Sequence, residues 1–268
     1  MRSAMVWWLC SVVALAACGS REPRHRERPA AKFGTLVGRV RLANGAALPA
    51  YASPDLVQAP LRAGAAAPVP SECRAAQDAA LRPVARADGG GLSGIVVAAS
   101  DFTHTPERDP QTHTLAIAHC RLQPPIVAAM AGDRLTLENR DDFAFEPLIG
   151  PAFAARALAP GRRVVLPLAP GVDSVRCSRR APCGRSDLVV FQHPVFAVTD
   201  ARGQFRIDRF PAAEMVRLSA WHPLFEPSET FVWIEPNGRG AVELVLSPKQ
   251  RFVAPVSEAA APRADALH

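Results

Sequence analysis

The stretch that decides the fold is CRLQPPIVAAMAGDRLTLEN, residues 120–139. Residues 126–130 form a short apolar run, Gly132 and Asp133 form a turn signal, and residues 134–138 alternate between apolar and polar side chains. A period of two predicts a strand with one buried face. The stretch therefore predicts a strand, a turn and a second strand, followed by an acidic loop at 139–142.

The same short pattern recurs on both sides of this stretch. We expect further strands at 35–42, 92–99, 114–122, 163–168, 173–177, 188–191, 197–199, 204–207, 215–220, 231–235 and 241–246. The strands at 92–99 and 114–122 are expected to pair as a hairpin, and 72–81 is the one short helix expected. Short strands at regular turn spacing predict an all-β chain of antiparallel sandwich architecture.

Composition agrees with a folded β-rich chain and excludes several other classes. The 268 residues are 49% hydrophobic and 21% charged, which is typical of a globular protein. The 26 prolines and 17 glycines are too many for a helical bundle. The net charge of +6 comes mostly from scattered arginines, so the sequence does not favour nucleic-acid binding.

The N-terminus carries a targeting signal. Arg2 precedes an apolar run at 5–17 that is too short to span a bilayer, which predicts a signal peptide at 1–17. Its end, LAAC, resembles the bacterial lipobox, and this resemblance implies lipidation of Cys18 and attachment to a membrane. Gly19 in place of aspartate implies delivery to the outer membrane, and residues 18–33 are expected to form a polar tether.

Four cysteines remain after Cys10 and Cys18 are set aside. They are Cys73, Cys120, Cys177 and Cys183, in a chain expected in an oxidising compartment, so we expect two disulfides. Four cysteines allow three pairings, and sequence alone does not choose among them. Proximity favours Cys177 with Cys183, which leaves Cys73 with Cys120.

Residues 120–139, with LAPGRRVVLPLAPG (158–171) and VRCSRRAPC (175–183), resemble the cupredoxin-like domains of bacterial envelope proteins. In that family a loop histidine and a later thiolate, imidazole and thioether bind copper. Here Phe145, Arg180 and Cys183 stand in place of the two histidines and the methionine, and Cys177 alone matches. Because arginine does not ligate copper, the resemblance implies the fold without its usual metal site.

A second resemblance is carried by FAVTDARGQFRIDRFPAAEMVRLSAWHP, residues 196–223. It is similar to the carboxypeptidase regulatory-like, transthyretin-like domain, whose signature is a Thr-Asp-x-x-Gly-x-Phe hairpin and a later proline turn. The residues that match are Thr199, Asp200, Gly203, Phe205 and Pro211, while Ala213 and Met215 replace the turn's glycine and tyrosine. Residues 34–49 also resemble the start of such a domain.

These resemblances give the expected domain order. After the signal peptide and tether come a cupredoxin-like β-sandwich at 34–192, a carboxypeptidase regulatory-like sandwich (transthyretin/Ig-like) at 193–248 and a disordered tail at 249–268. Since residues 34–49 also fit the second domain, its two parts can instead flank the first. The sequence leaves sequential and nested orders open.

Few residues stand out as a site. Trp221 and His222 at a strand end form a candidate surface site, with a core tryptophan beside a hydrogen-bonded histidine as the plainer interpretation. His104, His113 and His119 surround one predicted hairpin, and an acidic cluster lies at Glu138, Asp141, Asp142 and Glu146. For both groups we expect solvated loop residues rather than metal ligands.

No sequence motif for catalysis is present. Neither Gly-x-Ser-x-Gly, nor His-Glu-x-x-His, nor a phosphate-binding loop occurs, so we expect no catalytic residue, no cofactor and no metal. The predicted function is a lipid-anchored binding or scaffolding protein of the bacterial envelope, with an envelope protein or glycan as partner. Two alternatives remain: copper-based electron transfer through Cys177 with His193 or His119, and an accessory to a carboxypeptidase.

Overall fold

The computed structural model describes residues 33–58, 71–150, 153–154, 157–178 and 181–253. Every described residue belongs to one compact unit, Ala31–His268. The predicted signal peptide, Cys18, the tether up to residue 32 and Arg180 lie outside the described residues.

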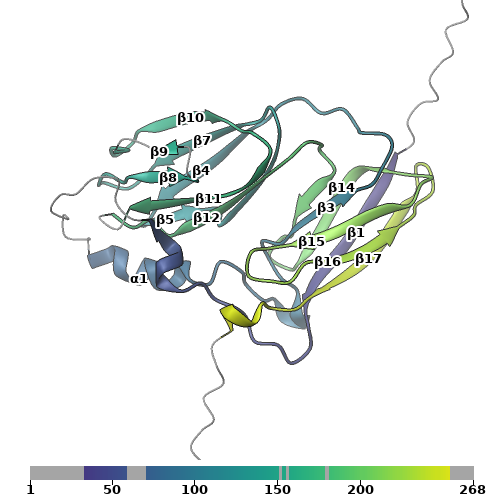
Figure 1. Cartoon of the computed structure of the whole chain (residues 1–268), viewed down its shortest axis with the longest axis horizontal. Helices are drawn as coiled ribbons and strands as arrows, with labels where there is room; N and C mark the ends of the chain where they lie inside the picture. The colour runs from purple at the N-terminus through teal and green to yellow at the C-terminus, as the bar shows by residue number, and fades with distance from the viewer. Residues whose placement is uncertain (1–32, 59–70, 151–152, 155–156, 179–180, 254–268) are drawn as a thin grey trace, which may run out of the picture. The chain divides into compact units, whose positions relative to one another are not determined.

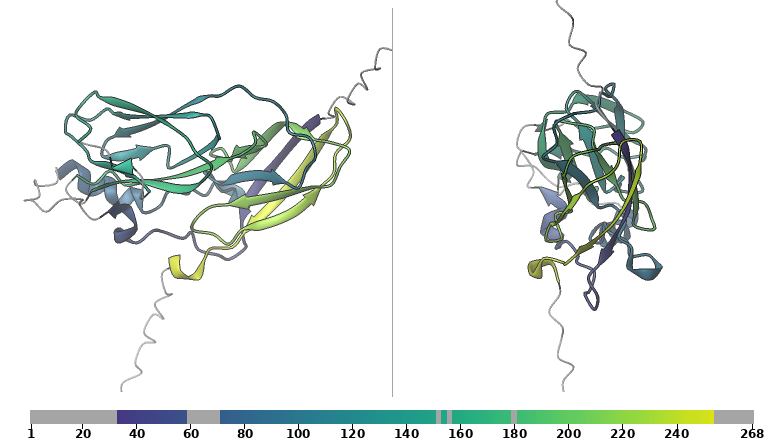
Figure 2. Two further views of the ribbon diagram at one scale, coloured as in Figure 1. Left: turned by 45° about the horizontal axis from the view of Figure 1, so that its top comes forward. Right: turned by 90° about the vertical axis from the view of Figure 1, so that its right-hand side faces the viewer.

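The described chain builds two β-sandwiches, which Figures 1 and 2 show as two groups of strands. We call the first the terminal sandwich, because it takes strands from both ends of the described chain. One of its sheets has the order β14 (Gln204–Pro211), β1 (Phe33–Leu42), β17 (Arg239–Leu246). The other has the order β13 (Phe196–Val198), β3 (Val96–Ser100), β15 (Val216–Trp221), β16 (Ser228–Val232).

The second group of strands is the inserted sandwich, whose chain runs between β3 and β13 apart from the short β2. Its first sheet has the order β10 (Arg163–Pro167), β7 (Arg134–Asn139), β4 (Thr112–Ala118), β5 (Arg121–Gln123). Its second has the order β6 (Ile126–Met130), β12 (Arg185–Phe191), β11 (Gly171–Ser178), β8 (Pro147–Ile149), β9 (Phe153–Ala154), with β2 (Val57–Gln58) beside β11. The helix α1 (Ser71–Ala80) lies close to the predicted 72–81.

The all-β prediction is confirmed, although the ladders are mixed rather than purely antiparallel. Parallel ladders join β1 with β17, β4 with β7, β6 with β12 and β2 with β11. Strands β6 and β7 coincide closely with the strands predicted from residues 126–138.

The two sandwiches are nested rather than sequential. Residues 33–42 and 96–100, which the sequential boundaries placed in a domain at 34–192, pair with strands from beyond residue 192. The hairpin expected between 92–99 and 114–122 does not form, because β3 and β4 belong to different sandwiches. Nesting also explains why residues 34–49 carry a resemblance to the start of the later domain.

The Thr-Asp-x-x-Gly-x-Phe motif forms a tight turn, as its chemistry predicts, but not the expected hairpin, because β13 and β14 belong to different sheets of the terminal sandwich. The Asp200 carboxylate accepts backbone N–H groups of Arg202 and Gln204, both over 2.8 Å. Gly203 has φ +77°, a left-handed conformation that suits glycine. The Thr199 hydroxyl donates to the carbonyl of Leu92 over 2.6 Å, which fixes this turn to the segment before β3.

Each sandwich has its own apolar core, and a third, smaller cluster joins them. That cluster contains Val96 from β3, Ile126 and Ala128 from β6, and Val189 from β12, all less than a tenth exposed. Three partly buried aromatic residues pack against it: Phe191, Phe196 and Trp221. The junction is therefore an apolar contact between the outer face of β3 and the outer face of β6 and β12.

The tail predicted as disordered begins with ordered residues. Residues Gln250–Phe252 form a short 3-10 turn, and the Phe252 ring packs edge-on against Tyr51 with 5.9 Å between ring centres. Residues 254–268 lie outside the described part. No helix among the described residues is long and apolar enough to cross a membrane.

Candidate functional site

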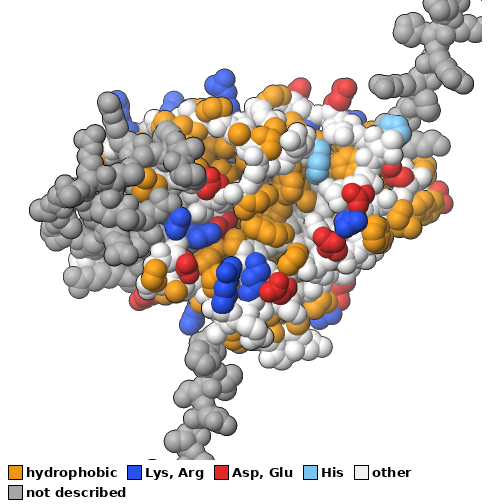
Figure 3. All heavy atoms as spheres, in the orientation of Figure 1, with side chains coloured by type: hydrophobic (Ala, Val, Ile, Leu, Met, Phe, Trp, Pro, Cys, Tyr) orange, Lys and Arg blue, Asp and Glu red, His pale blue; other side chains and the backbone are white. Residues whose placement is uncertain are grey.

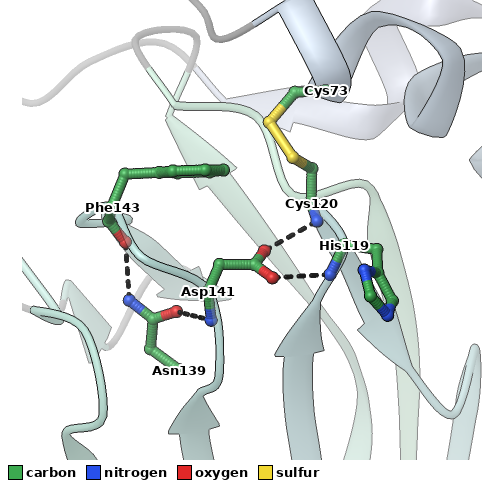
Figure 4. Close-up of a disulfide and its surroundings, with 6 residues drawn as sticks. All are labelled: Cys73, His119, Cys120, Asn139, Asp141 and Phe143. Carbon is green, nitrogen blue, oxygen red and sulfur yellow. Dashed lines mark hydrogen bonds between the residues drawn. A yellow bond between two sulfur atoms is a disulfide. The ribbon is translucent and has the colours of Figure 1, made fainter.

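The tight turn between β4 and β5 is held by a carboxylate and a disulfide (Figure 4). Its two central residues, His119 and Cys120, have φ +52° and +57°, which is uncommon for residues other than glycine. The Asp141 carboxylate accepts the backbone N–H of His119 over 2.6 Å and that of Cys120 over 2.7 Å. Asp141 is therefore a structural acceptor for this turn.

The Asn-x-Asp motif is structural as well. Asn139 is fully buried, and its amide donates to the carbonyls of Phe143 and Leu158, each over 2.8 Å. Its side-chain oxygen accepts the backbone N–H of Asp141 over 3.0 Å. This network fixes the loop after β7 and places Asp141 beside His119 and Cys120 of the β4–β5 turn (Figure 4).

Both predicted disulfides are confirmed. Cys73 on α1 is bonded to Cys120, and Cys177 on β11 is bonded to Cys183. The first bond ties α1 to the β4–β5 turn, and the second closes the loop between β11 and β12. All four side chains are at most 1% exposed.

The position at which the resemblance would require copper is filled by apolar side chains. Phe145, Cys177 and Cys183 are each 0% exposed and belong to the core cluster of the inserted sandwich. The Cys177 sulfur is engaged in a disulfide, so it is not a thiolate, and a phenyl ring has no lone pair to donate. These residues do not fit a copper ion.

The structure places the histidines apart from one another. His104 and His119 are exposed on different turns, whereas the His113 Nε2 lies 2.9 Å from the Asp133 carboxylate. Within the described ranges, no three side chains among His, Cys, Asp and Glu come close enough to hold a metal ion. In the acidic cluster, Glu138 pairs with Arg140 over 2.9 Å and Asp141 holds the β4–β5 turn.

Asp133 in the turn between β6 and β7 is a buried carboxylate with four donors. It accepts from the backbone N–H groups of Gln111 and Met130 and from the side chains of Arg108 and His113, over 2.6–2.9 Å. Burial alone would raise the pKa of Asp133, but these four hydrogen bonds outweigh it and lower the pKa below its usual range. Asp133 thereby fixes the segment that leads from the terminal to the inserted sandwich.

The prediction of a surface site at Trp221 and His222 is wrong, because His222 is buried. Its side chain is 1% exposed, and its Nδ1 accepts the backbone N–H of Leu224 over 3.2 Å. Burial, with Arg185 and Lys249 nearby, lowers the pKa of His222 to about 3. Trp221 is half-buried against the cluster between the sandwiches, so the pair offers no surface site.

A buried polar link at the junction was missed by the sequence analysis. The Tyr51 hydroxyl donates to the Asp187 carboxylate on β12 over 2.6 Å, and Arg185 pairs with the same carboxylate over 2.6 Å. The Arg185 guanidinium also lies 4.6 Å from the centre of the Tyr51 ring. Burial and the Asp187 charge raise the pKa of Tyr51. Nothing in the local sequence links residues 136 positions apart.

The described part of the chain includes two hollows with volumes large enough to receive another molecule. The larger, of about 850 Å³, lies on the outer face of the β14–β1–β17 sheet, where Arg41 already pairs with Glu243 and Arg206 with Asp208. The other, of about 430 Å³, opens between β10 and β11 and is mainly apolar. Its lining includes Ile149, Leu166, Leu168, Val172, Leu188 and Val190, with Asp173 as its charged group.

The chain is similar to several solved structures, each over about a third of its length. No family model and no curated protein matches the chain. A mutant of amicyanin in its Cu(I) form is 17% identical over 29% of this chain and 79% of its own, with a TM-score of 0.26. The copper-containing nitrite reductase NirK from Thermus scotoductus is 18% identical over 34% of this chain and 24% of its own, with a TM-score of 0.27.

A purple cupredoxin from Nitrosopumilus maritimus is also similar to part of the chain. It is 17% identical over 31% of this chain and 99% of its own, with a TM-score of 0.26. The matched portion is about a third of this chain in each of these three proteins.

Proposed function

We propose that this chain is a lipid-anchored binding protein of the bacterial cell envelope, without catalytic activity and without a conventional copper site. The observation that carries the proposal is the bond between Cys177 and Cys183 inside the apolar core of the inserted sandwich. In the resemblance to cupredoxin-like domains Cys177 stands at the position of the copper thiolate, and its bond to Cys183 supports a structural role for it instead.

The apolar hollow between β10 and β11 supports a binding role. Its volume of about 430 Å³ lies in the range of small-molecule sites, roughly 300–1,000 Å³. Leu188 and Val190 at its base are nearly buried, and Asp173 supplies one carboxylate at its side. Such a lining would take an apolar group that carries a hydrogen-bond donor.

Titration with a fluorescent apolar probe, such as 1-anilinonaphthalene-8-sulfonate or an uncharged analogue, tests this site. Leu166 on β10 lines the hollow, whereas Val165 next to it is 48% exposed on the opposite face. We expect Leu166→Glu to weaken saturable probe binding at least tenfold and Val165→Glu to leave it within twofold. Equal effects of the two variants would place the probe elsewhere and contradict the binding site.

The copper alternative is tested by copper addition together with a free-thiol count after denaturation. The proposal predicts no free thiol among the four core cysteines and no blue absorption. A blue, redox-active protein whose colour disappears in Cys177→Ser would establish electron transfer and end the proposal.

Lipid attachment is tested separately by mass spectrometry of the mature N-terminus from a bacterium that processes lipoproteins. We expect diacylglycerol and acyl mass on Cys18 and its loss in Cys18→Ser. An unmodified Cys18 in the mature chain would remove the anchor from the proposal and leave the binding site to be judged by its own test.

A further inference from the structure

Three large apolar side chains are exposed on the outer face of the β13–β3–β15–β16 sheet. Met215 is 57% exposed, Phe231 60% and Trp233 49%, and we call them the Trp233 patch. A soluble chain gains nothing from keeping three such side chains in water, so a contiguous group of them marks an interaction surface.

The strand register places these side chains together. Arg217 on β15 pairs with Phe231 on β16, and Val216 pairs with Val232, so Met215 and Trp233 follow as the next neighbours. Val216 is buried, so residues 215 and 217 point to the opposite, outer face. The Arg217 guanidinium lies 5.4 Å from the centre of the Phe231 ring, and its charge is paired with Asp101 over 2.8 Å and with Glu229 over 3.4 Å.

The patch lies at the end of the terminal sandwich where the described chain begins. The backbone N–H of Asn237 donates to the carbonyl of Phe33 over 2.8 Å. Ile234, the residue after Trp233, packs so closely on Gly34 that a Cβ there would lie 2.8 Å from its Cδ1. Figure 3 shows hydrophobic side chains exposed at this end, on the right of the view.

The position of the patch suits the proposed anchor. Phe33 is 15 residues after Cys18, a chain length that spans at most about 50 Å. A lipid on Cys18 would therefore keep the beginning of β1 within about 50 Å of the bilayer surface, close enough for the Trp233 patch, at the same end of the sandwich, to reach it.

The side chains of this end match a phospholipid surface. Tryptophan favours the membrane–water interface, where its ring is buried and its N–H stays hydrated. Two exposed arginines lie on the other sheet, at the same end of the sandwich: Arg209, whose guanidinium lies 5.0 Å from the centre of the Phe33 ring, and Arg239, which pairs in register with Thr35. Neither forms an ion pair with another described residue, and each would attract anionic headgroups.

We propose that the Trp233 patch lies in the headgroup region of the membrane to which the chain is anchored, and so sets the orientation of the terminal sandwich on that membrane. The proposal rests on the lipid anchor of the proposed function. It leaves the hollow between β10 and β11, on the inserted sandwich, available to a partner.

Tryptophan fluorescence tests this orientation directly. Of the four tryptophans, Trp7 and Trp8 fall within the predicted signal peptide, so Trp221→Phe leaves Trp233 as the reporter in the mature chain. The lipidated full chain is placed in vesicles of phosphatidylethanolamine and phosphatidylglycerol (3:1) that contain a lipid brominated near the headgroup. We expect at least twofold quenching of Trp233 and a blue shift of its emission.

Matched variants separate the patch from other exposed apolar residues. Trp233→Phe, which leaves Trp221 as the reporter, should show no quenching by the brominated lipid. Met215→Ser with Phe231→Ser should reduce Trp233 quenching by at least half, whereas Val165→Ser, at a residue 48% exposed on the inserted sandwich and outside the hollow, should not. If Trp221→Phe does not fold, the wild type gives the same comparison with about half of its emission quenched.

Each remaining outcome decides the proposal. Unquenched Trp233 in the lipidated, vesicle-bound chain overturns it. If Cys18 carries no lipid, vesicles are added to the unlipidated chain: quenching of Trp233 then retains the patch as a membrane surface, and its absence rejects it. A blue shift that grows with protein concentration without vesicles assigns the patch to a second copy of the chain and also overturns the proposal.

Discussion

The hydroxyl of Tyr51 lies 2.6 Å from the carboxylate of Asp187, and this hydrogen bond joins the two sandwiches. Tyr51 packs in the core of the terminal sandwich, whereas Asp187 stands on β12 of the inserted one. Asp187 is 1% exposed and also pairs with Arg185, so its charge is compensated within the junction. The cluster around Val96 supplies the apolar part of the same contact.

Tyr51→Phe should lower the free energy of unfolding by about 1–3 kcal/mol, because a buried carboxylate loses a donor while the ring packing is kept. Urea unfolding followed by circular dichroism measures this. Arg206→Ala is the control: it breaks an exposed ion pair with Asp208 and should change the value by no more than about 0.5 kcal/mol. If Tyr51→Phe has the same free energy of unfolding as the wild type, the Tyr51 hydroxyl does not stabilise the junction.

Asp133 should make the protein less stable in acid. Its folded pKa is lowered relative to the unfolded value of about 3.9, so its contribution is complete above that value and is lost as the pH falls towards the folded pKa. Asp133→Asn should cost about 2 kcal/mol at pH 7 and flatten the loss of stability below pH 4. The free energies of unfolding of the wild type and of Asp133→Asn, measured at pH 7, 4 and 3, test this prediction. If they fall equally with pH in both proteins, the loss of stability in acid does not come from Asp133.

His222 should make the free energy of unfolding depend on pH in a higher range than Asp133 does. Its pKa is about 3 in the folded chain and about 6.5 when unfolded, so only the unfolded state takes up the proton between these values. Stability is therefore complete above pH 6.5 and falls as the pH drops towards 3. His222→Leu should reduce this slope between pH 6.5 and 4 and leave the part that comes from His193, whose pKa burial also lowers. His104→Ala, at an exposed loop, should keep the full slope, and an undiminished slope in His222→Leu would count against the buried histidine.

The two disulfides should contribute unequally to the free energy of unfolding. Cys73–Cys120 spans 47 residues and Cys177–Cys183 spans 6, and loop-closure entropy gives about 4 and 2 kcal/mol respectively. Paired serine variants, Cys73→Ser with Cys120→Ser and Cys177→Ser with Cys183→Ser, allow the comparison by urea unfolding. The reverse order would mean that packing around the sulfurs, rather than loop length, sets their contribution.

The sequence contained enough information for some of the side-chain placements. Val216, Leu218 and Ala220 alternate on the buried face of β15, and His222 continues that alternation, so its burial could have been read from the same pattern. The turn at Asp200 was interpretable because the hydrogen bonds of the Asp200 carboxylate are local. The pairing of Cys177 with Cys183 was favoured for the same reason.

Other features depend on contacts between distant segments. The nested order appears only when β1 pairs with β14 and β17, about 170 and 200 residues later. Asp133 looked like an ordinary turn residue, because its donors Arg108, Gln111 and His113 come from a separate loop. Short-range patterns do not record such partners, since hydrophobic alternation fixes which face is buried and not which strand lies beside it.

The sequence by itself determined that this chain is all β and where several strands begin and end, and it favoured the bond between Cys177 and Cys183, because side-chain period and chain proximity act over a few residues. Tertiary structure alone decided that one sandwich is inserted in the other, that Tyr51 reaches Asp187, and that Met215, Phe231 and Trp233 share one exposed face. These depend on ladder register and on packing between sheets, which bring together residues that no local pattern connects.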